Sequence, residues 1–465
     1  MALWLWIKVG FVNYDTLYAL VWGRQIEHGH LPDYSVPLAP TPHPLWNLIG
    51  MVLSPLGALA SEHIIVALAY LGLGSLGYVI FRLGQEWFST PVGLLAAAFV
   101  LTREPILSYG VRAYVDLPYL VLVLTAVLIE TRRHRAALPV LGLLAAAGLL
   151  RPEAWLFSGG YLLYIAHTGS LERRRLLLLT LLALSAPFVW VLSDLVVTGQ
   201  PLWSLTHTHT TALVLHRTTG IVNVPITGAH RLGEILRPDG LVAAGVGVML
   251  CATLLRRNAR LGLIVVFVAG IALALVAAGG LPIDTRYAML LASILAIFAG
   301  AAVFGWLSLP SRHPFRRYWQ LTSVILIALV AILGPSQRKR LDKSFHILAG
   351  QQQIEDRLIA LVRRGELSRT CLPISIVGHR PIPQVALLIE VQPTALIPIG
   401  DRSFVQGTYL TPEPQDASVD YALDKSESLG GPATQERDFD LVHHGASWAV
   451  YQHCAQDAPN GSNRG

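Results

Sequence analysis

The chain has 465 residues, of which 53% are hydrophobic and only 14% are charged, and its mean hydropathy is +0.52. About a quarter of the residues of an average soluble domain are charged, so this composition excludes an ordinary soluble protein and indicates an integral membrane protein. The net charge of +6 does not indicate nucleic-acid binding, because the arginines stand in short clusters between apolar runs, where the positive-inside bias places them.

Apolar runs over the first 335 residues predict membrane-spanning helices. A helix needs about 20 apolar residues to cross about 30 Å of hydrocarbon, and it satisfies its own backbone hydrogen bonds there. The first run is short and contains Lys8, from which we expect a further N-terminal piece. About eleven spans are predicted, near 1–13, 63–83, 89–103, 115–131, 136–150, 152–168, 175–197, 241–255, 259–280, 286–308 and 318–335.

Basic clusters predict the orientation of these spans. The clusters fall on one side if the spans alternate and if 44–60 is a helix lying on the membrane face. The loop 13–62, the later loops 104–114, 198–240 and 281–285, and everything after about 336 then lie outside. The run Arg338, Lys339, Arg340 and Lys343 opposes this scheme. The clusters are Arg82; Arg132, Arg133 and Arg135; Arg173, Arg174 and Arg175; Arg256, Arg257 and Arg260; and Arg312, Arg316 and Arg317.

Residues 337–465 differ from the preceding 1–336 and predict a small soluble α/β domain with a disordered tail. Strands are expected at "CLPISIVG", "VALLIEV" and "WAVYQHC", an amphipathic helix at 351–367, and a polar loop region at 411–440. Cys371 and Cys454 both lie here. They are either a disulfide in an oxidising exterior or two free thiols.

Ionisable side chains gather on the predicted outer side, and at a membrane boundary such residues indicate function. A carboxylate near cations that hold a phosphate is what is needed to deprotonate a hydroxyl while an anionic leaving group departs. The prolines between 32 and 44 exclude a regular helix, so this segment is expected to form a rigid lid that holds Asp33 and His43 near Asp15. The set is Asp15, Glu27, His28, His30, Asp33, His43, Arg103, Glu104, Arg112, Asp116, Arg151, Glu153, Asp284 and Arg286.

Four segments carry a resemblance to a known family. "NYDTLYALVWGRQIEHGHLPDY" with "PTPHPL" resembles the first outer loop of the GT-C glycosyltransferases, in the group of the protein O-mannosyltransferases and aminoarabinose transferases. "YGVRAYVDLPYLVLVLTAVLIETRR" resembles the second acidic segment of that group, and "LLRPEAW" and "DTRYAML" resemble its later arginine-bearing turns. The likeness covers about residues 1 to 335. It implies an all-α polytopic membrane protein of GT-C type, followed here by the small C-terminal α/β domain.

The resemblance also implies roles for single residues. Asp15 becomes the base that activates an acceptor hydroxyl, and Asp116 the second catalytic acid. Arg112, Arg151 and Arg286 become ligands of the donor phosphate, since guanidinium groups bind phosphate bidentately. We expect Asp33, His43 and Glu153 to contact substrate. Thr16 stands where many members have a second acid, so a divalent cation is left open and no metal ligand is assigned.

The predicted function is transfer of a sugar from a polyprenyl-phosphate donor, without a nucleotide-sugar site, to a glycan, lipid or protein acceptor outside the plasma membrane. The alternatives are a secondary transporter and a non-catalytic assembly factor for cell-envelope glycans. A transporter is expected to carry its charges at mid-membrane between related halves, which are absent from this sequence. The sequence does not specify the sugar or the acceptor.

Structural roles compete with these assignments. Asp15 and Asp116 are also suited to cap the helices that follow them. Arg151 with Glu153, and Asp284 with Arg286, are alternatively ion pairs at helix ends. His43 alternatively bonds a loop carbonyl. His207 and His209 in "THTHT" have the spacing of a strand face, where they would either bind a metal or lie in a solvated loop.

Overall fold

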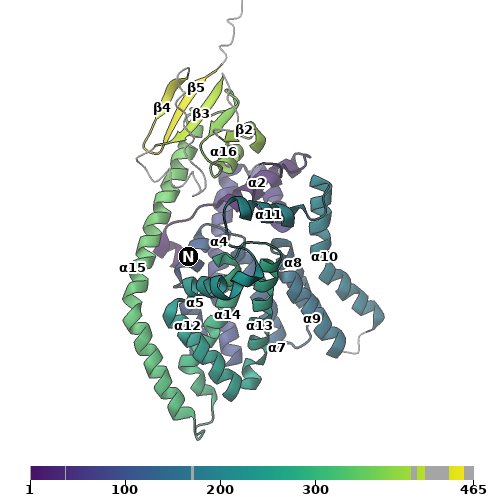
Figure 1. Cartoon of the computed structure of the whole chain (residues 1–465), viewed down its shortest axis with the longest axis vertical. Coiled ribbons are helices and arrows are strands. Elements are labelled where there is room, and N and C mark those ends of the chain that lie inside the picture. Colours follow the sequence, from purple (N-terminus) through teal and green to yellow (C-terminus); the bar gives the residue numbers. More distant parts are fainter. Residues whose placement is uncertain (1, 37, 169–171, 399–405, 414–438, 455–465) are drawn as a thin grey trace, which may run out of the picture.

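The computed structural model describes residues 2–36, 38–168, 172–398, 406–413 and 439–454. Helices make up most of the chain up to Arg363, and a five-stranded sheet stands over one end of the helical bundle (Figure 1). The helices are α1 (Ala2–Ile7), α2 (Tyr14–Glu27), α3 (Pro44–Leu53), α4 (Ala58–Trp87), α5 (Thr90–Val100), α6 (Glu104–Val111), α7 (Asp116–Arg132), α8 (Leu138–Leu150), α9 (Ala154–Thr168), α10 (Arg173–Thr198), α11 (Trp203–Val214), α12 (Ala229–Leu254), α13 (Arg256–Ala278), α14 (Thr285–Phe304), α15 (Arg316–Arg363) and α16 (Ile382–Leu388).

The protein is a multi-pass membrane protein, as predicted, but with fewer full spans than the predicted eleven. Within the described residues, six helices are long and apolar enough to cross a membrane. They are α4, α10, α13, α14, α15 and the stretch 221–254, whose last part is α12. The pair α5 and α6, bent by 65°, adds a seventh if it is one broken span. Where other spans were expected, α1, α7, α8 and α9 have only 6, 17, 13 and 15 residues. Two of these, α7 (Asp116–Arg132) and α8 (Leu138–Leu150), lie within one or two residues of the predicted spans 115–131 and 136–150.

Small residues let the helices approach closely, which is common among helices in membranes. Helices α2 and α3 cross at Gly23 and Gly50, where a Cβ on Gly23 would collide with the backbone of Gly50. Helix α14 runs through the middle of the bundle, and 83% of its apolar window is buried inside the protein. At Gly247 of α12, a Cβ would collide with the carbonyl of Phe298 in α14. These close approaches position the N-termini of α2 and α14.

Helix α15 joins the bundle to the sheet and runs along the side of the molecule (Figure 1). It includes the predicted span 318–335 and most of the predicted helix 351–367, which ends four residues early at Arg363. It passes the expected domain boundary at 336 without a break. Pro335 lies inside it. The residues that follow are mostly good helix formers, so the helix continues beyond this proline.

The sheet has the order β2-β1-β3-β5-β4, formed by β1 (Ile374–Ile376), β2 (Leu396–Pro398), β3 (Gly407–Pro412), β4 (Asp440–His444) and β5 (Trp448–His453). Strand β1 pairs in parallel with β2 and β3, and β3, β5 and β4 pair antiparallel. A disulfide joins Cys371 before β1 to Cys454 after β5, which resolves the alternative left open by the sequence. Strand β3 extends two residues into the predicted loop 411–440, and strand β4 begins at its last residue, Asp440. Most of that loop and the predicted disordered tail lie outside the described residues.

The segment "VALLIEV", predicted as a strand, is mostly helix α16. Its apolar run is buried throughout, and periodicity alone does not separate a short buried helix from a strand. Pro383 in its first turn favours the helix start. Arg24 of α2 donates to the carbonyls of Ala386, Leu387 and Val391 at 3.0 to 3.1 Å. These bonds hold the C-terminal domain over α2.

Candidate functional site

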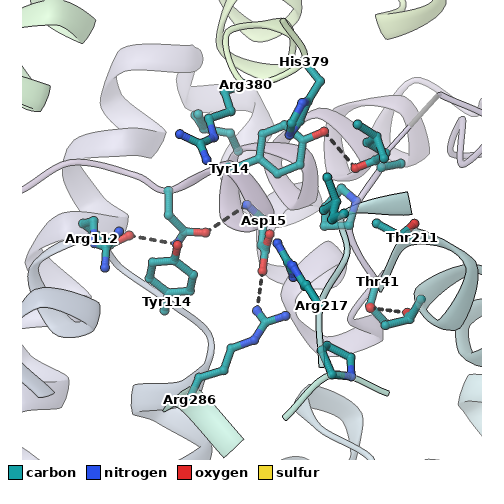
Figure 2. Close-up of a pocket in the computed structure, with 18 of the residues that line it drawn as sticks. Tyr14, Asp15, Thr41, Arg112, Tyr114, Thr211, Arg217, Arg286, His379 and Arg380 are labelled. Carbon is teal, nitrogen blue, oxygen red and sulfur yellow. Dashed lines mark hydrogen bonds and ion pairs between the residues drawn. The ribbon is translucent and has the colours of Figure 1, made fainter. Parts of the chain in front are cut away.

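A cavity of about 260 Å³ opens at the N-terminus of α2, beneath the C-terminal domain (Figure 2). Side chains from distant parts of the sequence surround it. Its walls come from α2, the proline-rich loop, the turn after α6, helix α11 and the start of α14, while α15 and the turn before α16 cover it. The polar lining residues are Asn13, Tyr14, Asp15, Thr41, Arg112, Tyr114, Thr208, Thr211, Arg217, Arg286, Gln351, Glu355, His379 and Arg380.

Asp15 lies at the centre of this cavity and does not cap α2. The cap is Asn13, whose Oδ1 accepts from the backbone N–H groups of Asp15 and Thr16 at 2.9 and 3.3 Å. The Asp15 carboxylate instead accepts from Nη1 of Arg286 at 2.8 Å (Figure 2). Both side chains are 17% exposed. The capping alternative for Asp15 is therefore wrong, and its carboxylate is left for the cavity.

Thr16, the departure from the family pattern, is fully buried and has a structural role. Its hydroxyl donates to the carbonyl of Ala113 at 2.8 Å and accepts from Nε1 of Trp46 at 3.0 Å. Asn13 Nδ2 donates to the carbonyl of Arg112 at 2.8 Å. These bonds tie the start of α2 to α3 and to the turn that carries Arg112, and so they set the distance between Arg112 and Asp15.

Four arginines and two carboxylates line the cavity, which favours an anionic ligand. The arginines are Arg112, Arg217, Arg286 and Arg380, and the carboxylates are Asp15 and Glu355. Arg217 pairs with Asp284 at 3.5 Å. Arg112 bonds the carbonyl and hydroxyl of Ser108 and lies over the rings of Tyr109 and Tyr114, and it pairs with no carboxylate among the described residues.

Asp116, Arg151 and Glu153 form a second, buried cluster beside the cavity. Arg151 pairs with Asp116 and, at 2.7 Å, with Glu153, and it lies over the ring of Tyr287. Asp116 is 1% exposed and Arg151 is 4% exposed. None of the three lines the cavity around Asp15; Arg151 and Glu153 share a small void with Arg286. Val115 holds the cap position of α7, so Asp116 is not a helix cap, and the Arg151–Glu153 pair does not face lipid headgroups.

His43 lies between the two clusters. It is buried, and its ring meets that of Trp190 edge to face. Burial is the main cause that lowers the pKa of His43 to about 3. The positive charges of Arg151 and Arg286 act in the same direction, and the Asp15 carboxylate and the Leu150 carbonyl act in the opposite direction. Leu150 ends helix α8, so the alternative in which His43 bonds a loop carbonyl is not confirmed. Burial keeps the ring neutral near pH 7.

We expect His43 to make the protein less stable as the pH falls below 6.5. The unfolded chain binds a proton near pH 6.5 and the folded chain only near pH 3, so the unfolded state holds more protons between these values. Stability then rises with pH across this window by at most about 1.4 kcal/mol per unit. Thermal unfolding in detergent from pH 4 to 7 should show a shallower slope for His43→Gln than for wild type. Equal slopes would contradict the prediction.

The proline-rich segment forms one wall of the cavity, as expected of a lid. Tyr14 donates to the carbonyl of Leu38, and Thr41 bonds Thr208 of α11. Asp33 is elsewhere: its carboxylate accepts from the N–H and the hydroxyl of Ser35, and it does not line the cavity. Neither His43 nor Asp33 lines the cavity, but the segment places His43 close enough to feel the charges of Asp15, Arg151 and Arg286.

The segment "THTHT" is part of helix α11, so the predicted strand face is wrong. His207 stacks on Trp203 one turn earlier and bonds the carbonyl of Ala39, and His209 bonds the carbonyl of Gly280. Among the described residues, no three His, Cys, Asp or Glu side chains gather as metal ligands. We therefore derive no step through a divalent cation, and metal dependence stays a prediction for a chelator to test.

Sequence reasoning missed several lining residues. Arg217 was assigned only to an outer loop, and Glu355, His379 and Arg380 belong to the domain that the resemblance does not cover. Arg217 lies three residues after the end of α11. An isolated arginine in a predicted outer loop was the one feature of the sequence that could have pointed to it. No signal within the sequence placed Arg380 in the same cavity as Asp15, because that position depends on how the C-terminal domain docks.

The fold of the chain is similar to that of solved structures with which it shares little sequence. A crystal structure of ArnT from Cupriavidus metallidurans bound to undecaprenyl phosphate matches with a TM-score of 0.53 and 12% identity, over 96% of this chain and 95% of that one. The apo state of ArnT from the same organism matches with a TM-score of 0.51 and 14% identity, over 97% and 96%. The fold predicted by the resemblance is thus confirmed.

A further structure, the archaeal oligosaccharyltransferase AglB from Archaeoglobus fulgidus with an inhibitory peptide and a dolichol-phosphate, matches over 87% of this chain and 66% of that one, with 11% identity and a TM-score of 0.46. No protein-family model matches the sequence, and no curated protein matches it either.

Proposed function

We propose that this protein is a membrane glycosyltransferase that moves a sugar from a polyprenyl-phosphate donor to an acceptor hydroxyl, with Asp15 as the general base. The observation that carries the proposal is the position of Asp15: a carboxylate released from helix capping, in an open cavity, 2.8 Å from Arg286 and accompanied by Arg112 and Arg217. The ArnT structure with the same fold holds undecaprenyl phosphate, which supports a lipid-linked donor.

The charges of the cavity suit a phosphate leaving group. Guanidinium groups stay charged at any working pH and bind phosphate oxygens through paired N–H groups. Arg112 has donors to spare, and Arg286 keeps a buried Nε that bonds nothing among the described residues. Arg286 is therefore suited to contact Asp15 and a phosphate at the same time. Arg151 remains a proposed phosphate ligand, although two carboxylates already neutralise it.

The reaction is a single displacement at the anomeric carbon. The acceptor oxygen forms the new bond to this carbon, and the bond from the carbon to the phosphate oxygen breaks. The acceptor proton passes to Asp15. The polyprenyl phosphate leaves already charged, so it needs cations more than it needs an acid. The configuration at the anomeric carbon inverts.

The acceptor enters beneath the C-terminal domain. His379 and Arg380 precede α16 and hang over Asp15 on the side opposite Arg286 (Figure 2). In this arrangement the arginines of the helical bundle bind the donor phosphate, and His379 and Arg380 of the C-terminal domain contact the acceptor. We assign the outer face of the plasma membrane to this end of the molecule, which the disulfide in the covering domain supports.

The test is transfer by the purified protein from a panel of radiolabelled polyprenyl-phosphate sugars to a membrane-derived acceptor pool, with and without chelator. Consumption of one lipid-linked donor supports the proposal, and loss of transfer in chelator would establish a divalent cation. If no donor is consumed, the proposal fails, and uptake of solutes into liposomes is the next assay.

We expect Arg112→Gln to raise the KM for the donor with little change in stability. Losing one charge-assisted hydrogen bond to a phosphate costs about 1.5–3 kcal/mol, or roughly 10- to 100-fold in KM. Arg112 is only half-buried and lacks a carboxylate partner, so the folded state loses little. Initial rates against donor concentration measure the effect, and Arg24→Gln, whose side chain holds the C-terminal domain, is the comparison for an indirect change.

A further inference from the structure

The basic run that opposes the predicted orientation has a counterpart in the structure. Arg340 and Lys343 of α15 face Arg237 of α12 across a pocket of about 220 Å³, which also reaches the start of α6. These residues lie about 100 positions apart in sequence, so the folded chain brings the cations together. The pocket shares no lining residue with the cavity around Asp15. It is a separate site.

Positive charge exceeds negative charge in this pocket. Arg237, Arg340 and Lys343 make no side-chain hydrogen bond or ion pair within the part of the chain that the structure describes. Two carboxylates line the same pocket: Glu104 accepts from the hydroxyl of Ser344 at 2.9 Å and keeps its negative charge, whereas Glu234 pairs with Arg231 at 2.7 Å. Three cations against the single free charge of Glu104 favour the binding of a further anion.

The backbone at Arg237 is strained, which indicates that its side chain has a role. Its φ of 65° and ψ of 170° fall in a region that is almost reserved for glycine. Pro238 forces the preceding residue out of the helical region and breaks α12 here. Glycine would adopt this conformation freely, so an arginine at this position costs stability and presents a guanidinium to the pocket.

A crevice continues from this pocket along α15. The neighbouring space, about 430 Å³, shares Gln337 with the pocket. Its apolar wall includes Trp6, Val330 and Leu341, and its charged lining residues are Arg103, Asp239, Arg338 and Asp342, of which the first two pair with each other. Apolar side chains of α15 stay exposed towards the membrane below this level, and Ile325 and Ile332 are 61% and 74% exposed. A cationic pocket above a crevice with an apolar wall and an apolar helix face matches the two ends of a phospholipid.

We propose that the pocket formed by Arg237, Arg340 and Lys343 binds the phosphate headgroup of an anionic membrane phospholipid, whose acyl chain lies in the crevice along α15. The occupant is a phospholipid rather than the sugar donor, because the pocket and the Asp15 cavity have no lining residue in common. The inference does not depend on the proposed glycosyl transfer. It also accounts for a basic run on the predicted outer side, since these cations are held by a lipid headgroup.

Native mass spectrometry of the full-length protein, taken from micelles that hold equal amounts of phosphatidylglycerol and phosphatidylcholine, tests the proposal. Wild type should retain phosphatidylglycerol in preference. Arg340→Gln with Lys343→Gln should lower that retention about tenfold or more, since each basic residue near a lipid headgroup contributes about one decade or slightly less. Lys339→Gln with Arg364→Gln removes the same charge from α15 and from the residue that caps its C-terminus. Neither residue lines the pocket, so retention should be unchanged.

Arg237→Gly is the second variant. It removes the guanidinium and relieves the backbone, so it should lower phosphatidylglycerol retention while the thermal unfolding temperature in plain detergent stays equal or rises. Equal retention in both double variants, or equal retention of phosphatidylcholine by wild type, would overturn the proposal. Retention of undecaprenyl phosphate in place of phosphatidylglycerol through the same residues would also overturn it and assign the pocket to the donor.

Discussion

Asp15→Asn is expected to lower kcat for sugar transfer by about 10²–10⁴-fold, the usual contribution of a positioned general base. The amide keeps the size of the side chain and the contact with Arg286, but it does not accept the proton of the acceptor hydroxyl. The N-terminus of α2 should remain intact, because Asn13 and not Asp15 caps it. Single-turnover transfer from a radiolabelled donor measures the chemical step, and donor binding should change little.

Two other acids serve as comparisons for Asp15. Asp33→Asn changes an acid of the same loop that bonds Ser35 outside the cavity, and it should leave kcat near the wild-type value. Glu355 lines the cavity from α15 and is the nearest rival base within the described lining. If Asp15→Asn retained full transfer while Glu355→Gln lost it, Asp15 would not be the base. An equal loss in Asp15→Asn and Asp33→Asn would indicate a general disturbance of the loop.

Arg151→Gln is expected to destabilise the protein by about 3–5 kcal/mol, the usual result of removing one partner of a buried ion pair. Asp116 would keep its charge in a site that is 1% exposed, and Glu153 would lose its only ion-pair partner among the described residues. The second oxygen of Asp116 already has no hydrogen-bond partner there. Thermal and denaturant unfolding of the purified protein in detergent measure the loss.

Arg132→Gln is the matched comparison for Arg151. It breaks an ion pair with Glu86 whose partners are 39% and 32% exposed, and such pairs contribute about 0–1 kcal/mol. The double change Asp116→Asn with Arg151→Gln should recover part of the loss, because residues in contact are not additive. A stable Arg151→Gln protein with a raised KM for the donor would contradict this structural role and support the phosphate role that the resemblance implies.

The sequence predicted the fold class well because composition and apolar runs report directly on burial in lipid. The small helix α8 shows the limit of this reasoning. The apolar run predicted its position, since α8 ends at Leu150 like the predicted span 136–150, but it did not show that the next residue, Arg151, turns inward to Asp116. Short segments were ambiguous for another reason: "THTHT" and "VALLIEV" carry strand-like patterns, while stacking of His207 on Trp203 and burial of α16 on all sides favour helices.

The same reasoning predicted some of the residues that line the cavity and was wrong about others. Asp15, Arg112 and Arg286 meet in one cavity, as the loop pattern predicted, whereas Asp116, Arg151 and Glu153 neutralise one another beside it and Asp33 lies outside. A sequence shows which residues are ionisable and near a membrane boundary. It does not show which of them pair, because an ion pair depends on distances of a few ångströms between helices that are far apart in the chain.

By itself, the sequence determined that this is a multi-pass membrane protein with a C-terminal α/β domain, and that its ionisable residues gather towards one end of the bundle. The free energy of hydrophobic burial is a sum over many residues, so the amino-acid composition is enough to predict it. Only the tertiary structure decided that Asn13 rather than Asp15 caps α2, that Arg286 reaches Asp15, and that His379 and Arg380 cover the cavity. Each of these depends on single contacts between segments brought together by close packing at Gly23 and Gly50 and by the docking of α16 on α2.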